Sequence, residues 1–191
     1  MKTTMIKTIP IAALAAMLLT LGACSNMFNE LDTAGGDVAF EYELGDEGPA
    51  GGRIFYIDKD DNHSWTYLEA APEGTEWNFK EWGGNGTKIG GDAQLEGIGD
   101  GRAATDAIVD HMESIAETGT AAQICDGLSH NGYDDWFLPS LDELEKMHDN
   151  LYQAGLGGFT NEVYWSSSEE HSSEAHVYDF MDYSSMYTKD N

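Results

Sequence analysis

Residues 131–144 constrain the fold of this chain more than any other stretch, because several local signals follow one another without a gap. The pair Asn131 and Gly132 is typical of a tight turn. Residues 135–138 are short, aromatic and apolar, which predicts a buried strand. Pro139 ends this strand, because proline cannot donate a hydrogen bond to a strand ladder. The sequence therefore predicts a turn that leads directly into a buried strand.

A helix follows this strand, and Ser140 and Glu143 mark its first turn. These two residues have the spacing of a capping box, in which each side chain accepts a hydrogen bond from a backbone N–H at the helix start. Apolar residues then recur at helical spacing, so we predict a helix over residues 140–154. The same periodicity predicts another helix over residues 102–118.

Short runs of apolar and aromatic residues, each bounded by turn residues, predict further strands over residues 53–58, 64–70, 163–167 and 175–180. The first two are joined by a polar turn, so we expect them to form a hairpin. The glycine-rich segment 73–99 lacks periodicity, and we expect a long ordered loop that its aromatic side chains pin to the domain. Two helices among short antiparallel strands and long loops make an α+β domain.

The first 23 residues have the pattern of a signal peptide rather than of a folded segment. Lys2 and Lys7 give a positive start, and residues 9–21 form an apolar run. This run has about the length of a signal-peptide core and is too short for a comfortable membrane span. We therefore predict that residues 1–23 are a signal peptide that lies outside the folded domain, and that this domain starts near Gly45.

Residues 21–24, Leu-Gly-Ala-Cys, are similar to a bacterial lipobox. In lipoproteins with this motif the cysteine receives a diacylglycerol and becomes the new N-terminus, which implies lipidation of Cys24. Several acyl chains anchor a protein stably, because each buried methylene contributes about 0.8 kcal/mol. Ser25 gives no signal for inner-membrane retention, so we expect a cell-envelope protein on the outer membrane surface, with a flexible tether over residues 24–44. An ordinary secretory signal with a chance cysteine is the alternative.

The charge of the mature chain disfavours several classes of partner. Removal of 23 residues from 191 leaves 168, which suits one domain with one core. The signal segment takes two of the nine basic residues and none of the 35 acidic ones, so the remaining net charge is −28. Repulsion therefore opposes encounter with nucleic acid, anionic lipid surfaces and sulfated glycans. With Cys24 lipidated, Cys125 has no disulfide partner in the monomer, and we expect it to be a buried thiol.

Four motifs carry a family resemblance: residues 48–56 (Gly-Pro-Ala-Gly-Gly-Arg-Ile-Phe-Tyr), 67–72 (Tyr-Leu-Glu-Ala-Ala-Pro), 132–144 and 164–168 (Tyr-Trp-Ser-Ser-Ser). Together they resemble the Lcl C-terminal domain family, named after a collagen-like bacterial adhesin. The resemblance implies a C-type-lectin-like fold of the formylglycine-generating-enzyme variety over residues 45–191, and extracellular ligand binding rather than catalysis. Phe137 stands where many members have arginine. Members also continue into a basic, apolar last strand that this sequence lacks, which predicts an unpaired neighbouring strand edge and reduced stability.

Residues 166–191 hold the candidate ligand-binding residues. Of these 26 residues, 16 are Ser, His, Tyr, Asp or Asn, a composition that adaptable binding surfaces use. Surface lipoproteins diversified by a retroelement share the implied fold and vary their C-terminal end, so a variable target protein of this kind is one alternative. An ordinary polar loop is another. The candidate ligand-binding residues are Glu169, His171, Glu174, His176, Tyr178, Asp182, Tyr183 and Tyr187.

The sequence predicts no metal, cofactor or catalytic site. Residues 58–69 mimic the spacing of a calcium loop, but His63 occupies the position that requires glycine, so a hairpin turn is the preferred interpretation. His171 and His176 lack a helical metal-binding pattern, and we expect a surface cluster there. Formylglycine-generating enzymes rely on paired cysteines that the lipidated chain would lack.

Four of the five tryptophans divide into two expected classes. We expect Trp136 and Trp165 to fill the core, whereas Trp77 and Trp82 are candidates for sugar stacking or for pinning the long loop. The sequence therefore predicts a non-catalytic, adhesin-like domain of a bacterial surface lipoprotein whose ligand is a protein or a glycan. A structural envelope lipoprotein, which packs against other envelope proteins, is the alternative class.

Overall fold

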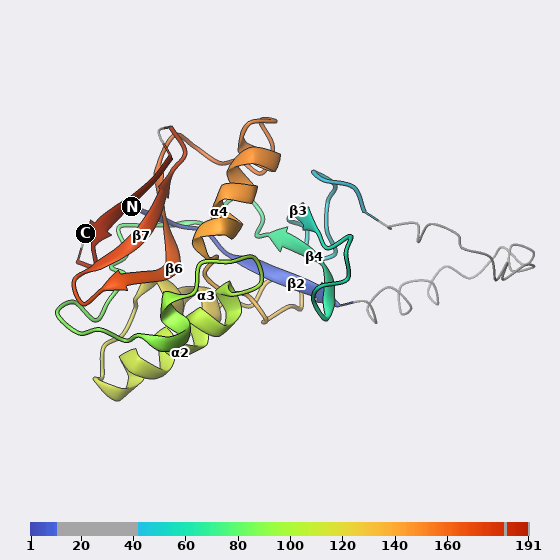
Figure 1. The fold of residues 1–191 in the computed structure, drawn as a ribbon. Helices are drawn as coiled ribbons and strands as arrows, with labels where there is room; N and C mark the ends of the chain where they lie inside the picture. The colour runs from blue at the N-terminus through green and yellow to red at the C-terminus, as the bar shows by residue number, and fades with distance from the viewer. Residues whose placement is uncertain (11–41, 182, 191) are drawn as a thin grey trace, which may run out of the picture.

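The computed structural model describes residues 1–10, 42–181 and 183–190, and within them the fold is α+β. The α-helices are α2 (Gly101–Ser114), α3 (Ala121–Asp126) and α4 (Leu141–Met147), with a 3-10 turn η2 (Gly91–Gln94) and a π-helical turn η3 (His148–Tyr152). Figure 1 shows α2 and α3 on one side of the molecule and α4 between the two sheets. No helix in this described part of the chain is long and apolar enough to cross a membrane.

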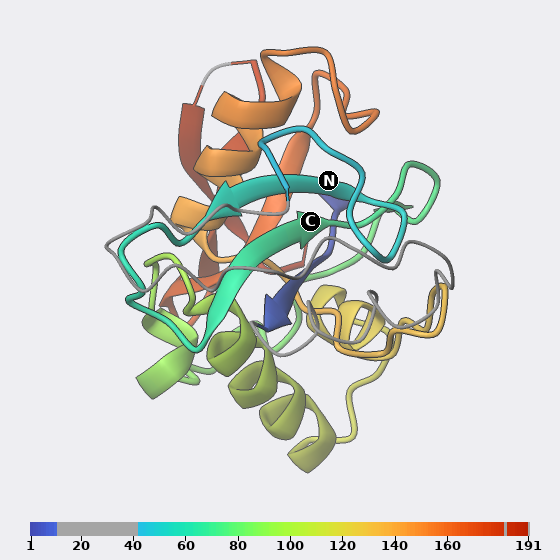
Figure 2. The ribbon, with the colours of Figure 1, turned by 90° about the vertical axis from the view of Figure 1, so that its right-hand side faces the viewer.

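The strands form two sheets. The larger has the order β5-β1-β6-β7-β8, with β1 (Lys2–Thr3), β5 (Trp77–Asn78), β6 (Val163–His171), β7 (Glu174–Asp179) and β8 (Tyr183–Thr188). The smaller has the order β2-β4-β3, with β2 (Ile6–Pro10), β3 (Arg53–Ile57) and β4 (Trp65–Ala70). Pairing is antiparallel except between β1 and β6. In Figure 2, β3 and β4 face the viewer, with α2 below them and α4 above.

The first ten residues belong to the fold, which differs from the expectation that the folded part starts near Gly45. β1 joins the larger sheet between β5 and β6, and β2 pairs with β4 in the smaller one. Met5 and Ile6 are fully buried. The apolar and basic pattern that suggests a signal also suits buried strands, and the structure places β1 inside the larger sheet and β2 beside β4. Cys24 and residues 24–41 of the predicted tether lie outside the described residues, and lipidation stays a prediction.

Two large clusters of buried side chains make the core. One contains Trp82, Trp136 and Trp165, and the other lies between α4 and the strands around Phe55 and Tyr164. The prediction that Trp136 and Trp165 fill the core is confirmed, because both are fully buried. Each such side chain removes about 150–250 Å² from water, so these rings dominate the packing.

The capping box at Ser140 and Glu143 is confirmed. Ser140 N–H donates to Glu143 Oε2 at 2.7 Å, and Glu143 N–H donates to Ser140 Oγ at 3.3 Å. The helix that begins there ends as α4 at Met147 and continues as η3, so it is interrupted rather than regular to residue 154. The other predicted helix begins at Gly101, close to expectation, and ends at Ser114, four residues early.

The segment predicted as a buried strand, residues 135–138, forms no regular strand. The segment is buried at Trp136, Phe137 and Leu138, but only Phe137 makes a bridge, to Ile6. The reason is that the side chain of Thr105 on α2 bonds to the backbone of Leu138, in the place of a neighbouring strand. Its Oγ accepts from Leu138 N–H at 3.1 Å and donates to Leu138 O at 3.2 Å. A side chain therefore satisfies backbone groups that a ladder would otherwise use.

Candidate binding surface

The C-terminal hairpin, which we define as residues 174–188, forms one edge of the larger sheet (Figure 1). It consists of β7, a tight turn and β8, with Ala175 opposite Tyr187 and His176 opposite Met186. β8 is the outermost strand of this sheet, and residues 185–188 are all exposed. Because alternate side chains of a strand point to opposite faces, β8 is exposed on both faces.

A buried ion pair holds the base of this hairpin. Lys189 Nζ lies 2.6 Å from Glu169 Oε1, and both side chains are completely buried. Glu169 also accepts hydrogen bonds from the backbone N–H groups of Ile89 and Gly90, at 2.9 and 2.7 Å. Lys189 Nζ donates to Thr87 O at 3.1 Å and lies 4.7 Å from the centroid of the Trp82 ring. The pair thus fixes the long loop against the sheet.

This arrangement changes the role expected for Glu169. The sequence predicts a ligand contact there, but the carboxylate faces the interior and its oxygens are already occupied by Lys189 and two backbone N–H groups. The ion pair also helps to fix the long loop, which we expected its aromatic side chains to pin. Trp82 does contribute, since it is fully buried and its Nε1 donates to Ser166 O at 2.8 Å.

Tyr178 is likewise placed in the interior, with 4% of its surface exposed. Its ring packs against His148 and Phe180 at centroid distances of 5.3 and 5.9 Å. Tyr187 lies on the opposite face of the hairpin, because it pairs with Ala175, three positions away from Tyr178 along β7. The two tyrosines therefore cannot anchor the same ligand on one flat surface.

The two histidines of the hairpin region each pair with a carboxylate. His171 Nε2 lies 3.0 Å from Glu174 Oε2, and both side chains are partly exposed. His176 Nε2 lies 3.0 Å from Glu170 Oε2, and its side chain is mostly buried. No group of three or more metal-ligating side chains occurs in the described parts of the chain.

Of the predicted ligand residues, the structure leaves His171, Glu174 and Tyr187 accessible. Asp182 lies outside the described residues, and Tyr183 is placed by its pairing with Asp179. Met186, which is 49% exposed, and the exposed Met181 in the turn were missed. Residues 183–188, with tyrosine and threonine at their ends, have some strand-forming character that could have revealed β8 and hence Met186.

A second exposed surface lies at the opposite edge of the same sheet. Trp77 on β5 is half exposed, and Phe79 is 89% exposed with a backbone φ of 57°. Trp77 and Trp82 are the two sugar-stacking candidates. Because Trp82 is fully buried, only Trp77 of this pair has an accessible ring. Lys80 Nζ lies 5.7 Å from the Trp77 ring centroid and covers part of it.

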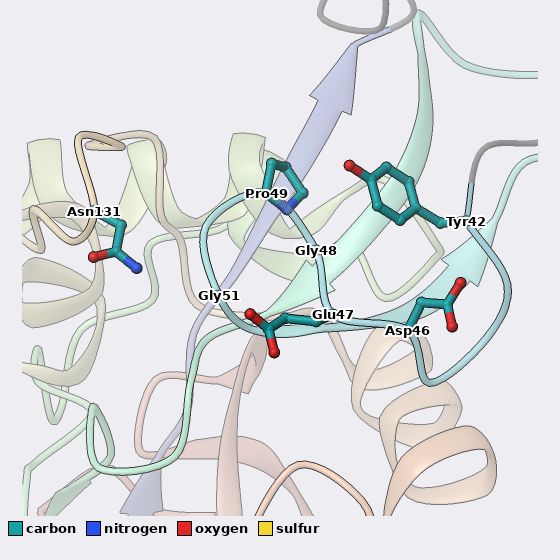
Figure 3. A pocket seen from close by; sticks show the side chains of 7 residues that line it. All are labelled: Tyr42, Asp46, Glu47, Gly48, Pro49, Gly51 and Asn131. Carbon is teal, nitrogen blue, oxygen red and sulfur yellow. The ribbon is translucent and has the colours of Figure 1, made fainter. Parts of the chain in front are cut away.

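A pocket of about 610 Å³ shares no lining residue with either edge, and it is lined by Tyr42, Asp46, Glu47, Gly48, Pro49, Gly51 and Asn131 (Figure 3). Glu69 holds the loop beneath it, because its Oε1 accepts from the N–H groups of Ala50 and Gly52 at 3.1 and 2.7 Å. Burial raises the pKa of Glu69, and these hydrogen bonds oppose the rise. A Cβ at Gly52 would lie 1.8 Å from Ala70 O, so only glycine fits there.

Cys125 is a buried thiol, as expected, and among the described residues it is the free cysteine. Burial raises its pKa well above the usual value, which makes it a poor nucleophile. Its Sγ donates to Thr4 O at 3.6 Å, so the thiol lies against the N-terminal segment.

Comparison of the chain with protein-family models, with curated proteins and with solved structures finds no significant match in any of the three.

Proposed function

We propose that this protein is a non-catalytic ligand-binding lipoprotein of the bacterial cell envelope, with a C-type-lectin-like domain that binds a protein through the C-terminal hairpin. The observation that carries the proposal is β8, an edge strand exposed on both faces that presents Met186 and Tyr187 to solvent. The α+β architecture and the buried tryptophans are consistent with the implied fold.

An exposed edge strand is costly to leave open, because its free backbone groups can pair with strands of other chains. The same property makes it a docking element for an extended segment of a partner, with main-chain hydrogen bonds for affinity and side chains for specificity. Tyrosine and methionine are enriched in protein interfaces, which favours a protein over a glycan ligand here. The net charge of −26 over the whole chain favours a ligand with a neutral or basic surface.

The hairpin is also anchored at its base. The ion pair joins Lys189, directly after the hairpin, to Glu169 on β6, and both side chains also bond to the long loop. Tyr178 of the hairpin packs against His148. A ligand that adds to β8 would therefore lose little free energy in ordering the protein.

Binding should depend on the two apolar side chains of β8. We expect the double substitution Met186→Glu and Tyr187→Ala to weaken binding to any protein found on an array at least about tenfold. The free energy of unfolding should change by no more than about 1 kcal/mol per position, because Met186 and Tyr187 are partly exposed, at 49% and 37%. Affinity is measured by surface plasmon resonance and stability by urea unfolding.

The matched control is the double substitution Trp77→Ala and Phe79→Ala at the opposite edge of the same sheet, which should leave the affinity unchanged. If this control lost binding and the β8 variant kept it, the binding site would lie at β5 and not at β8. Envelope proteins that co-purify equally with both variants would instead favour the structural lipoprotein.

Lipidation is tested separately on Cys24. We expect cells fed an alkyne-tagged fatty acid to label the wild-type protein and to label a Cys24→Ala variant not at all, with the variant lost from the membrane fraction. Cys125→Ala is the control and should keep its label, because that thiol is buried. A wild-type chain without label would contradict the proposed anchor.

A further inference from the structure

Residues 1–10 fill a long slot between the two sheets, which we name the strand slot. In it, Ile6, Lys7 and Thr8 pair with Ala70, Glu69 and Leu68 of β4, while Lys2 pairs with Tyr164 of β6. Backbone carbonyls of the segment accept from the neighbouring loops, with Ala71 N–H donating to Met5 O at 2.8 Å and Phe79 N–H donating to Met1 O at 3.0 Å.

The other edge of the segment is also bonded. Ile6 N–H donates to Phe137 O at 3.0 Å, and Phe137 N–H donates to Ile6 O at 2.9 Å. The slot therefore offers backbone partners on both sides of an extended chain. Such a site binds main chain rather than one particular side chain, so any strand of suitable side-chain pattern meets its backbone requirements.

Three apolar side chains of the segment reach three different core clusters. Met5 joins the cluster of Trp82 and Trp136, Ile6 joins the cluster between α4 and the sheets, and Ile9 joins a third one with Ile54 and Tyr67. All three are at most 2% exposed. An empty slot would thus open all three clusters to water at once, which disfavours leaving it unfilled.

One cation is buried in the same slot. Lys7 is 1% exposed, its Nζ lies 3.9 Å from the Tyr133 ring centroid and 3.9 Å from Asp135 Oδ1, and the residue pairs with Glu69 on β4. Burial lowers the pKa of Lys7, and attraction by Asp135 and Glu69 opposes that shift. The slot therefore provides an aromatic face and two carboxylates for a positive charge, in a chain with a net charge of −26.

The residues that fill the slot are the ones that the signal-peptide pattern marks for removal. We infer that, once residues 1–23 are cleaved away, the strand slot binds an extended segment of a partner polypeptide. The segment would follow the pattern of Met5–Ile9, which is apolar, apolar, Lys or Arg, any residue, apolar. This inference rests on the processing at Cys24 that belongs to the proposed function. The charge complementarity at Lys7 selects a basic partner segment over a neutral or acidic one.

The test uses the full chain, nicked after folding. A site-specific protease sequence is inserted after position 24 of a Cys24→Ala chain, so that residues 1–24 become a separate fragment held only by the slot. We expect the fragment to co-elute with the remainder in gel filtration. A fluorescent peptide with the sequence of residues 1–10 should then exchange into the slot, as read by fluorescence anisotropy.

Peptide variants test the stated chemistry. A Lys7→Glu peptide should bind at least about 100-fold more weakly, because it places a buried acid beside Glu69 and Asp135. A Lys2→Glu peptide carries the same charge change where the lysine is also mostly buried but pairs with one carboxylate, Glu76, so it should lose less affinity than the Lys7→Glu peptide. Equal binding of the wild-type and Lys7→Glu peptides would overturn the inference.

Three further outcomes would also overturn it. The first is a nicked chain that loses its fragment, stays folded and binds no peptide. The second is a nicked chain that unfolds and does not refold with added peptide. The third is a dimer that the peptide disrupts, which would assign the slot to a second copy of this chain. Failure of fatty-acid labelling with normal peptide exchange would count against the lipid anchor and the processing at Cys24, but not against the capacity of the slot to bind a strand, so the two results are read separately.

Discussion

Replacing Glu169 by alanine is expected to lower the free energy of unfolding by about 3–5 kcal/mol, the largest effect of any single substitution considered. The change removes the carboxylate 2.6 Å from Lys189 Nζ and leaves a buried cation without its counter-charge. It also leaves the N–H groups of Ile89 and Gly90 without an acceptor. Urea unfolding of the two proteins measures the difference.

A second variant separates the charge from the packing. Glu169→Gln with Lys189→Met removes both charges and keeps one oxygen for the backbone N–H groups, so the double variant should be more stable than Glu169→Ala. Glu174→Ala is the matched control, because its ion pair with His171 is partly exposed and should be worth less than about 1 kcal/mol. If Glu169→Ala and Glu174→Ala lowered the free energy of unfolding equally, the buried ion pair would contribute no more to stability than the exposed one.

Stability is expected to fall by about 3 kcal/mol as the pH rises from 4.5 to 7, through the titration of Glu143. Burial raises the pKa of Glu143 to about 7 from a usual value of 4.5, although N–H groups of Ser140 and Gly99 donate to its carboxylate. Between these two values the folded protein keeps a proton that the unfolded chain has released. The contribution is therefore complete below pH 4.5 and lost as the pH passes 7.

The Glu143→Gln variant checks this assignment, because it cannot titrate. Its free energy of unfolding, measured by urea at a series of pH values, should change less between pH 4.5 and 7 than that of the wild type. The raised pKa values of Glu69 and Asp142 act in the same direction and remain in both proteins. Parallel stability profiles for the two proteins would therefore exclude Glu143 as the source.

Local signals allowed the regular elements to be predicted from sequence. The capping box at Ser140 and the hairpin of β3 and β4 depend on neighbouring residues, and both occur where expected. Interactions between residues far apart in the sequence could not be predicted from local signals. Thr105 displaces a strand partner from Leu138, and no periodicity reveals which side chain will reach across from a helix.

The candidate site shows the same division. Composition marked residues 166–191 as polar and adaptable, but composition does not tell a buried carboxylate from an exposed one. The partner of Glu169 is Lys189, 20 residues further along the chain, beyond the hairpin. Without knowledge of that pairing, Glu169 is predicted to be a surface residue. For residues 1–10 the pattern itself is ambiguous, because a basic, apolar decapeptide satisfies both a signal pattern and a strand pattern.

The larger sheet separates positions that the fold needs from positions that it can do without. The hydroxyls of Ser166 and Ser168 are committed to His176 O and Leu95 O, whereas residues 185–188 hold no part of the buried core. Sequence drift in the last strand would therefore cost the domain little, while the serines two strands away tolerate almost none. Substitutions in this one peripheral strand can therefore change the exposed surface of the domain while the buried scaffold stays the same.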